Sequence, residues 1–257
     1  MNYLNINKQA WNNRTKIHMK SKFYDVESFK KGKSSLNKIE LNQVGNVKDK
    51  SLLHLQCHFG QDTLSWARLG AKVTGVDLSS EAIKEANLLK ESLGLEATFI
   101  ESDVCAFGKD NKQQFDIVFT SYGVLSWLEN LDDWAKTIAN SLKAKAEFHM
   151  VEFHTFSDIL SGYSYFPNNK PDIEEEGTYT ENCDGSMSTI ATWSHSISEV
   201  ITALINAGLT IETFCEYAYS PYNCFENLEF VPNLGYQMLY EGQQVPLLYS
   251  IKARKLS

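Results

Sequence analysis

The chain has 257 residues, of which 43% are hydrophobic, 12% aromatic and 22% charged. This length and composition predict a globular protein with a large core and exclude intrinsic disorder over most of the chain. The formal net charge of −8 argues against non-specific binding to nucleic acid or an anionic membrane, because phosphate groups attract clustered Lys and Arg. We therefore expect a small molecule as the partner.

The cysteines and the apolar segments indicate the compartment. The N-terminal residues 1–16 contain no apolar signal core, and no run of about eighteen apolar residues suggests a membrane span. We expect a cytoplasmic protein in a reducing environment, and the sequence does not indicate its oligomeric state. A disulfide framework or zinc ribbon is not expected because the cysteines form no close pair: Cys57, Cys105, Cys183, Cys215 and Cys224.

The first 45 residues are polar and are interrupted by aromatic side chains such as Trp11 and Phe23. They predict an N-terminal helical arm with a turn at residues 31–33, packed on the rest of the protein through these aromatics. Two interpretations of this arm (residues 1–45) remain open. It is either a cap on the core or a lid over a ligand.

From Ser51 onward, short apolar runs alternate with amphipathic helical segments. Parallel strands need helical crossovers, and nearly continuous apolar runs fit a sheet that is buried on both faces. The pattern therefore predicts an α/β fold with a doubly wound, mostly parallel sheet. The first five strands are predicted at residues 52–55, 73–76, 97–100, 115–119 and 148–153.

The second half of the chain adds irregular segments to this sheet. Residues 155–195 show no period and are predicted to form an insert or lid. Ser196 and Glu199 have capping-box spacing and open a helix, which is followed by strands at 209–214 and 245–253 with a second insert at 217–244. We expect a single domain (1–257) composed of the arm, a core at 46–154, the insert at 155–195 and a C-terminal part at 196–257.

Polar groups follow four consecutive strands, at the edge where open parallel sheets bind ligands. Residues 54–60 lead into a helix whose N-terminal amides attract negative charge. Asp77 ends the second strand and can accept hydrogen bonds from both hydroxyls of a ribose. Asp103 follows the third strand, where it can contact an adenine amino group, and residues 121–123 follow the fourth. This order and spacing favour a cofactor that contains adenosine.

Residues 53–60, 75–79, 102–104 and 115–118 resemble motifs I to IV of the class I S-adenosylmethionine-dependent methyltransferases. The resemblance covers roughly residues 45–155, and the later helix and two closing strands match the family's usual ending. It implies a seven-stranded Rossmann-like sheet with an antiparallel last strand, and S-adenosyl-L-methionine as the cofactor. The implied cofactor-binding residues are Gln56, His58, Gly60, Gln61, Asp62, Asp77, Leu78, Asp103, Val104 and Ser121.

The loop after the first strand departs from the pattern of the family, which has an acidic residue and three alternating glycines there. This chain has His54 at the acidic position and Gln56 and His58 at the first two glycines, and it keeps only Gly60. Glycine permits positive φ and close approach of the backbone. Gln56 and His58 must therefore turn their side chains away or contact the ligand. The run 56–63 is similar to a branch of the family that uses such a loop.

Methyl transfer requires a nucleophile in line with the sulfonium methyl, at about 3 Å, together with exclusion of water and a proton acceptor. Glu152 and His154 share a face of the fifth strand and are candidates for a catalytic base or substrate-orienting group. Tyr122 is a third catalytic candidate, because an aromatic ring attracts the sulfonium. The alternative is that Glu152 and His154 are a satisfied structural pair tied to the long insert. A metal site with His149 is disfavoured, because His149 points to the opposite face of a regular strand.

The sequence thus predicts a methyltransferase whose small organic acceptor lies under the two inserts. The acidic run at 174–176 could attract a cationic acceptor. An alternative from a different class is a catalytically silent S-adenosylmethionine-binding module that acts as a regulator or partner. A nucleotide-dependent oxidoreductase is disfavoured because no G-x-G-x-x-G follows the first strand.

Overall fold

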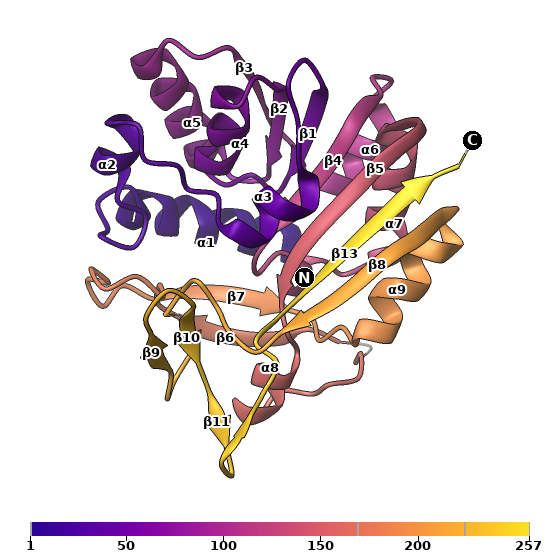
Figure 1. The fold of residues 1–257 in the computed structure, drawn as a ribbon. Coiled ribbons are helices and arrows are strands. Elements are labelled where there is room, and N and C mark those ends of the chain that lie inside the picture. Colours follow the sequence, from indigo (N-terminus) through magenta and orange to yellow (C-terminus); the bar gives the residue numbers. More distant parts are fainter. Residues whose placement is uncertain (1, 169, 224, 257) are drawn as a thin grey trace.

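A seven-stranded sheet forms the centre of the computed structural model, which describes residues 2–168, 170–223 and 225–256 (Figure 1). Cys224 lies outside the described residues, and the other four cysteines are free thiols. The strands of the sheet are β1 (Ser51–Leu55), β2 (Lys72–Asp77), β3 (Ala97–Glu101), β4 (Phe115–Ser121), β5 (Leu142–Phe153), β8 (Leu209–Tyr217) and β13 (Leu248–Lys255).

The strand order is β3-β2-β1-β4-β5-β13-β8, in which β1 to β5 are parallel and β13 is antiparallel to both of its neighbours. This arrangement confirms the predicted doubly wound sheet with an antiparallel last strand. Because β1 pairs with both β2 and β4, the order of the strands reverses beside β1. That reversal is the switch point at which such sheets bind ligands.

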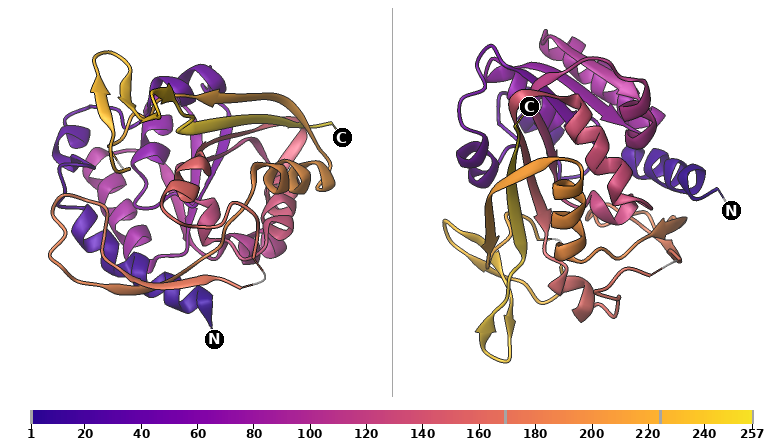
Figure 2. Two further views of the ribbon diagram at one scale, coloured as in Figure 1. Left: turned by 90° about the horizontal axis from the view of Figure 1, so that it is seen from below. Right: turned by 90° about the vertical axis from the view of Figure 1, so that its right-hand side faces the viewer.

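Helices cover both faces of the sheet (Figure 2). One face carries α3 (Lys38–Val44), α4 (Gln61–Arg68) and α5 (Ser80–Leu93). The other carries α6 (Val104–Asp110), α7 (Leu131–Ser141) and α9 (Ile197–Asn206). The remaining helices are α1 (Tyr3–His18), α2 (Val26–Lys30), the 3-10 turn η1 (Leu125–Trp127) and α8 (Phe156–Leu160).

The ends of these helices follow their capping residues. Ser79 Oγ accepts a hydrogen bond from Ala82 N at 3.0 Å and begins α5, which ends at Gly94 in the left-handed conformation. Ser196 caps α9 through the backbone of Glu199. The second half of the predicted capping box is replaced, since the Glu199 carboxylate lies 3.1 Å from Nδ1 of His195.

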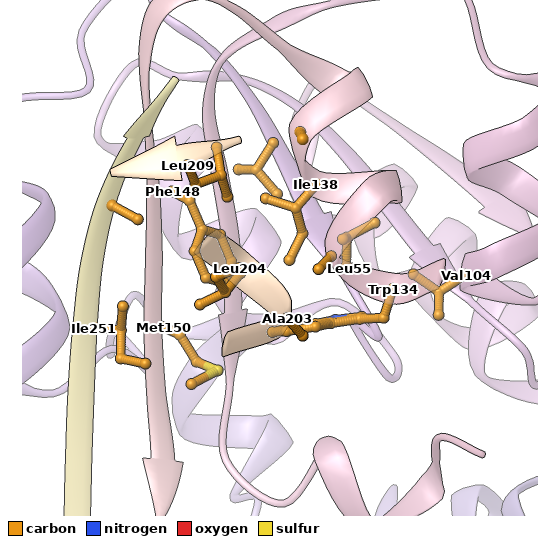
Figure 3. Close-up of a cluster of buried hydrophobic side chains, with 14 of the residues drawn as sticks. Leu55, Val104, Trp134, Ile138, Phe148, Met150, Ala203, Leu204, Leu209 and Ile251 are labelled. Carbon is orange, nitrogen blue, oxygen red and sulfur yellow. The ribbon is translucent and has the colours of Figure 1, made fainter. Parts of the chain in front are cut away.

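The largest hydrophobic cluster lies between the sheet and α6, α7 and α9 (Figure 3). Trp134 and Ile138 of α7 project from one side onto Phe148 and Met150 of β5, and all four side chains are buried. Trp134 and Phe148 meet edge to face, with ring centroids 5.8 Å apart. This packing fixes α7 on the sheet and thereby fixes the loop that joins β4 to α7.

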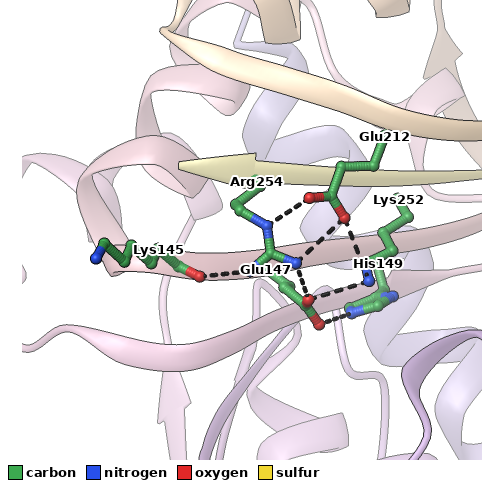
Figure 4. A network of polar contacts seen from close by, with 6 residues as sticks. All are labelled: Lys145, Glu147, His149, Glu212, Lys252 and Arg254. Carbon is green, nitrogen blue, oxygen red and sulfur yellow. Dashed lines mark hydrogen bonds and ion pairs between the residues drawn. The ribbon is translucent and has the colours of Figure 1, made fainter. Parts of the chain in front are cut away.

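A charged network links the last three strands toward the amino end of β5 (Figure 4). Arg254 of β13 contacts both Glu147 of β5 and Glu212 of β8, and Lys252 Nζ lies 3.0 Å from Glu147 and 3.2 Å from Glu212. Opposite charges on neighbouring strands favour this register, and a network contributes more than an isolated exposed pair. His149 belongs to the same network through Glu147, on the side of β5 opposite to Glu152.

The two inserts contain more regular structure than their sequence indicates. The first holds α8 and an antiparallel hairpin of β6 (Asp172–Glu176) and β7 (Ser188–Thr192). The second holds two short pairs, which are β9 (Glu229–Val231) with β10 (Gly235–Gln237) and β11 (Leu239–Tyr240) with β12 (Gln243–Gln244). Both inserts lie at the lower end of the sheet in Figure 1, toward which β5 runs.

Two strands begin three or more residues away from their predicted starts. β5 begins at Leu142, six residues before the predicted start, because the chain passes directly from α7 into the strand. β13 begins at Leu248 rather than Val245, and residues 245–247 instead pack with the second insert. Among the described residues, none of the helices is both long and apolar enough to cross a membrane.

Trp134→Ala tests the packing that holds α7 to the sheet. We expect this change to lower the free energy of unfolding by about 3–5 kcal/mol, because it removes a buried indole and leaves a cavity. Leu88→Ala on α5 is the control, since Leu88 is half exposed and its loss should cost no more than about 0.5 kcal/mol. Urea denaturation measures both values, and a loss below about 1 kcal/mol for Trp134→Ala would contradict this account of the core.

Candidate functional site

The loop between β1 and α4 has a left-handed backbone at alternate residues. The φ angles are +56° at Gln56, +50° at His58 and +81° at Gly60. Residues other than glycine adopt this backbone conformation at a cost of about 1–2 kcal/mol each. Gly60 tolerates no side chain at all, because a Cβ there would lie 2.6 Å from the ring of Phe99. The loop therefore keeps the backbone shape that three alternating glycines would give, although two of its residues carry long side chains.

Asp77, at the end of β2, holds this loop. Its Oδ2 accepts a hydrogen bond from His58 N at 2.7 Å, and its Oδ1 accepts one from Ser79 N at 2.8 Å. Burial raises the pKa of Asp77 to about 6, and the backbone N–H groups of Ser79, His58 and Leu78 work in the opposite direction. The carboxylate thus fixes the loop after β1 relative to the start of α5.

The side chains of Gln56 and His58 turn toward neighbouring elements. Gln56 Nε2 donates to the carbonyl of Val124 at 2.9 Å, while Gln56 Oε1 is buried without a partner. His58 Nε2 lies 2.9 Å from His18 Nδ1, and the buried Nδ1 of His58 has no partner. Burial lowers the pKa of both histidines, so both rings are neutral and one donates to the other. Gln56 and His58 replace glycines of the family pattern. Each therefore makes one side-chain hydrogen bond and keeps one polar atom without a partner.

The N-terminal arm lies over this loop. The ring of Trp11 packs against His58 at 5.2 Å and against Trp127 at 5.1 Å. Arg14 lies 5.5 Å from the ring of Trp11 and 5.2 Å from that of Trp127, and it pairs with Glu176 of β6 at 2.6 Å. Its Nε is buried without a partner. The arm is therefore tied to the insert as well as to the core, and it covers the loop.

Glu152 of β5 holds the loop that follows β4. Its carboxylate accepts backbone N–H groups from Gly123, Val124, Leu125 and Phe153, with distances of 2.9 Å to Val124 N and 3.2 Å to Leu125 N. Burial raises the pKa of Glu152, and these four donors work against that shift. Four donors satisfy the acceptor capacity of the carboxylate, and this arrangement favours a positioning role over the predicted role as a base.

His154 also has both of its polar atoms engaged. Its Nδ1 accepts a hydrogen bond from Phe156 N at 3.1 Å, and its Nε2 lies 3.0 Å from Glu216 of β8. The Nδ1 acceptor role places the ring proton on Nε2, which donates to Glu216. These contacts tie His154 to the start of the first insert. They engage both ring nitrogens of His154, and its catalytic role stays a prediction.

Tyr122 is the predicted catalytic residue with a free polar atom. Its ring packs against Tyr222 with centroids 5.0 Å apart, and its buried hydroxyl makes no hydrogen bond. It faces Glu40 of α3, which is completely buried. Glu40 Oε1 accepts hydrogen bonds from Asn37 N at 3.2 Å and Asn37 Nδ2 at 3.1 Å, whereas Oε2 has no partner. Burial, together with repulsion from Asp62, raises the pKa of Glu40 to about 7.

Sequence reasoning missed Glu40. The only signal it gives is the Asn37-x-x-Glu40 spacing, which indicates a helix cap, and both halves of that capping box are present. No sequence pattern places the second oxygen of Glu40 beside the end of β4, since α3 belongs to the arm and Glu40 lies 82 residues before Tyr122.

The other predicted residues lie along the same edge. Ser121 Oγ donates to Asp62 at 3.3 Å, and Gln61 Nε2 donates to the carbonyl of Tyr24 at 2.9 Å. Asp103 caps α6 through Ala106 N at 2.7 Å. Two further predicted residues contribute in other ways, since the side chain of Val104 is part of the core and Leu78 is half-buried.

Five of the fifteen buried polar side-chain atoms that lack a partner among the described residues lie along this edge. Native structures satisfy nearly all such atoms, so a cluster of them is typical of a ligand site. The cluster comprises Arg14 Nε, Glu40 Oε2, Gln56 Oε1, His58 Nδ1 and the Tyr122 hydroxyl. Two open cavities of about 470 and 450 Å³ lie elsewhere, between α7 and α9 and between α6 and α7, and their linings include none of these five residues. We therefore assign the functional site to the edge of the sheet that holds these five unpartnered polar atoms. Within the described part of the chain, no group of three or more His, Cys, Asp or Glu side chains is arranged to hold a metal ion.

Comparison with known proteins finds methyltransferases among the relatives of this chain. Residues 53–148 match the family model of a methyltransferase domain. The ubiquinone biosynthesis O-methyltransferase of Serratia proteamaculans is 30% identical over 122 residues, which cover 46% of this chain and 49% of that protein. The protein of the same name from Saccharophagus degradans is 25% identical over 207 residues, which cover 78% and 82% of the two chains. The match thus spans about half the length of one relative and most of the other.

Solved structures share the fold over nearly the whole chain. An S-adenosylmethionine-dependent methyltransferase from Methanosarcina mazei superposes with a TM-score of 0.60 at 18% identity, covering 86% of this chain and 98% of that one. Magnesium protoporphyrin IX methyltransferase from Synechocystis PCC 6803, solved with bound S-adenosylhomocysteine, gives a TM-score of 0.55 at 14% identity and covers 99% and 100%. At these identities the likeness establishes the common fold.

Glu152→Gln tests whether this carboxylate positions the loop after β4. We expect the variant to lose about 2–3 kcal/mol of unfolding free energy, because an amide nitrogen would face backbone donors that the carboxylate now satisfies. Glu174→Gln, at an exposed position of β6, is the matched control and should change stability by no more than about 0.5 kcal/mol. Thermal or urea unfolding measures the difference. Equal stability of the two variants would show that Glu152 does not anchor the loop.

Proposed function

We propose that this chain, whose residues 53–148 match the family model of a methyltransferase domain, is a class I S-adenosylmethionine-dependent methyltransferase that transfers the methyl group of S-adenosyl-L-methionine to a small organic molecule. The observation that carries the proposal is the left-handed backbone at Gln56, His58 and Gly60, held by Asp77 at the switch point of the sheet. That loop precedes the N-terminus of α4, whose free N–H groups suit a carboxylate.

The residues along this edge fit the parts of the cofactor. Each Asp77 oxygen accepts one backbone N–H and keeps a second lone pair for a ribose hydroxyl. Asp103 uses Oδ2 for its cap, and its other oxygen can accept from an adenine amino group. The unpartnered Gln56 Oε1 and His58 Nδ1 offer polar contacts to the methionine part. When bound, S-adenosyl-L-methionine supplies an electrophilic methyl group on a sulfonium.

The remaining groups serve alignment and exclusion of water. Glu152 fixes the backbone of Gly123 and Val124 and thereby the position of Tyr122 at the end of β4. Tyr122 and Tyr222 present aromatic rings, which attract cations such as a sulfonium. The arm and the two inserts cover this end of the sheet, and the acceptor would lie beneath them. The names of the curated relatives support a small organic acceptor.

One observation favours a second candidate, a catalytically silent binding module. The side chains of Gln56 and His58 and the Trp11 ring pack together where a loop of glycines would leave open space. Cofactor binding to this chain would then depend on movement of the arm. A silent module would bind the cofactor or its product without transferring the methyl group to any acceptor.

Calorimetric titration with S-adenosylhomocysteine tests the binding step of both candidates. We expect the wild-type protein to bind, and Asp77→Ala to weaken binding at least tenfold, because it removes charge-assisted hydrogen bonds to the ribose. Asp77→Asn keeps one acceptor oxygen and should lose less, which separates ribose contacts from loss of the loop. Asp110→Ala, at the exposed end of α6, is the control and should bind as the wild type does. Unchanged affinity in a folded Asp77→Ala protein would refute the proposed site.

A further inference from the structure

We propose that Glu40, Asp62 and Tyr122 form the acceptor site, that this site takes a primary or secondary amine in its protonated form, and that Glu40 removes the ammonium proton before methyl transfer. This inference rests on the function proposed above and adds the acceptor class and the base. It assigns catalytic contact to a residue of the N-terminal arm, whereas the family match begins only at residue 53.

The first support is the position of Glu40. Its neighbour Ile39 packs against Val151 of β5 and Leu248 of β13, and this contact seats α3 across the carboxyl end of β5. Glu40 has no exposed surface, and the cap with Asn37 uses one carboxylate oxygen. The other oxygen, Oε2, is buried and free. The cap therefore holds the carboxylate in one orientation and leaves one oxygen for a ligand.

The second support is Tyr122. Its backbone is left-handed, with φ of +50°, and its N–H donates to Val151 O at 2.7 Å. The phenol ring lies between Phe153 and Tyr222, at centroid distances of 5.7 and 5.0 Å. Its buried hydroxyl lies beside Glu40, and Asn37 links the two residues through Tyr222, since Asn37 Nδ2 donates to Glu40 Oε1 at 3.1 Å and to the Tyr222 hydroxyl at 2.8 Å. The free oxygen of Glu40 and the phenol of Tyr122 therefore lie at one end of the sheet, where a single ligand donor can serve both.

The third support is charge. Glu40 is completely buried and Asp62 is half-buried, and burial, followed by repulsion from Asp62, raises the pKa of Glu40. None of the ion pairs among the described residues includes either carboxyl group. Buried carboxyl groups without a counterion favour a cation or a proton beside them. An ammonium group supplies both the charge and the hydrogen-bond donors, and the tyrosine rings add cation–π attraction.

Proton transfer precedes formation of the new bond. The ammonium group of the acceptor transfers one proton to Glu40 Oε2, which frees the nitrogen lone pair. That lone pair forms the new C–N bond to the methyl carbon, while the S–C bond breaks and its electron pair stays on sulfur as a thioether. The products are an N-methylated ammonium ion, S-adenosylhomocysteine and a protonated Glu40, whose proton then passes to solvent. A carboxyl group with a pKa near 7 is suited to this exchange at neutral pH.

Glu40→Gln is the decisive variant, because glutamine keeps the shape and the capping contact with Asn37 but cannot take a proton. The probes are tyramine and other aralkyl and alkyl amines, each paired with the alcohol of the same skeleton, tyrosol in the case of tyramine. Thermal shift on protein saturated with S-adenosylhomocysteine measures binding, and transfer of labelled methyl from S-adenosyl-L-methionine measures turnover. Glu91→Gln, at an exposed position of α5, is the matched control.

We expect at least one amine, and not its alcohol, to stabilise the loaded wild-type protein and to be methylated. Glu40→Gln should lower kcat/KM for that amine about 100-fold or more, with affinity for S-adenosylhomocysteine within about threefold of wild type, and Glu91→Gln should change neither. The inference is overturned if no amine stabilises the loaded protein, if alcohols act equally well, or if Glu40→Gln keeps its activity. It is also overturned if Glu40→Gln loses affinity for S-adenosylhomocysteine, since Glu40 would then hold the ammonium group of the cofactor. Failure of the wild type to bind S-adenosylhomocysteine would instead refute the proposed function itself.

Discussion

The hydrogen bond from His58 N to the Asp77 carboxylate is the interaction on which the rest of the site depends. Without it, two residues with long side chains would have little reason to stay in a left-handed conformation that costs about 1–2 kcal/mol at each position. Because Asp77 also accepts from Ser79 N, the same carboxylate fixes the loop after β1 and the start of α5. A binding edge formed by two strands is thus held in shape by one buried side chain.

Three buried carboxyl groups at this end of the sheet differ in how many of their acceptor positions are used. Glu152 accepts four backbone donors and fixes the loop after β4. Asp77 accepts two and keeps lone pairs for a ligand. Glu40 has one oxygen capped and one free. The number of lone pairs left without a donor therefore distinguishes Glu152, which supports the backbone, from Asp77 and Glu40, which can contact a ligand. Neither a sequence motif nor burial alone makes this distinction.

The sequence predicts the sheet well because its strands and caps are local. The apolar runs locate β1 to β4, and α5 is bounded by Ser79 and Gly94, which are residue types typical of helix ends. The loop at residues 54–60 and Asp77 are also found, because spacing after a strand fixes their place. Glu40 and the Glu216 partner of His154 could not be predicted, since both depend on contacts between distant segments. The β6–β7 hairpin was missed for the same reason, because β7 is held by the arm through Asn7, which bonds both N and O of Ala191.

A crystal structure of the protein with S-adenosylhomocysteine tests the central claim most directly. The account predicts both ribose hydroxyls within hydrogen-bonding distance of Asp77, the homocysteine part along residues 56–61, and positive φ preserved at Gln56 and His58. It also predicts that the thioether sulfur faces the hydroxyl of Tyr122. A ligand bound away from Asp77, or a loop that abandons its left-handed backbone to admit the ligand, would contradict the claim that this buried carboxylate preforms the site.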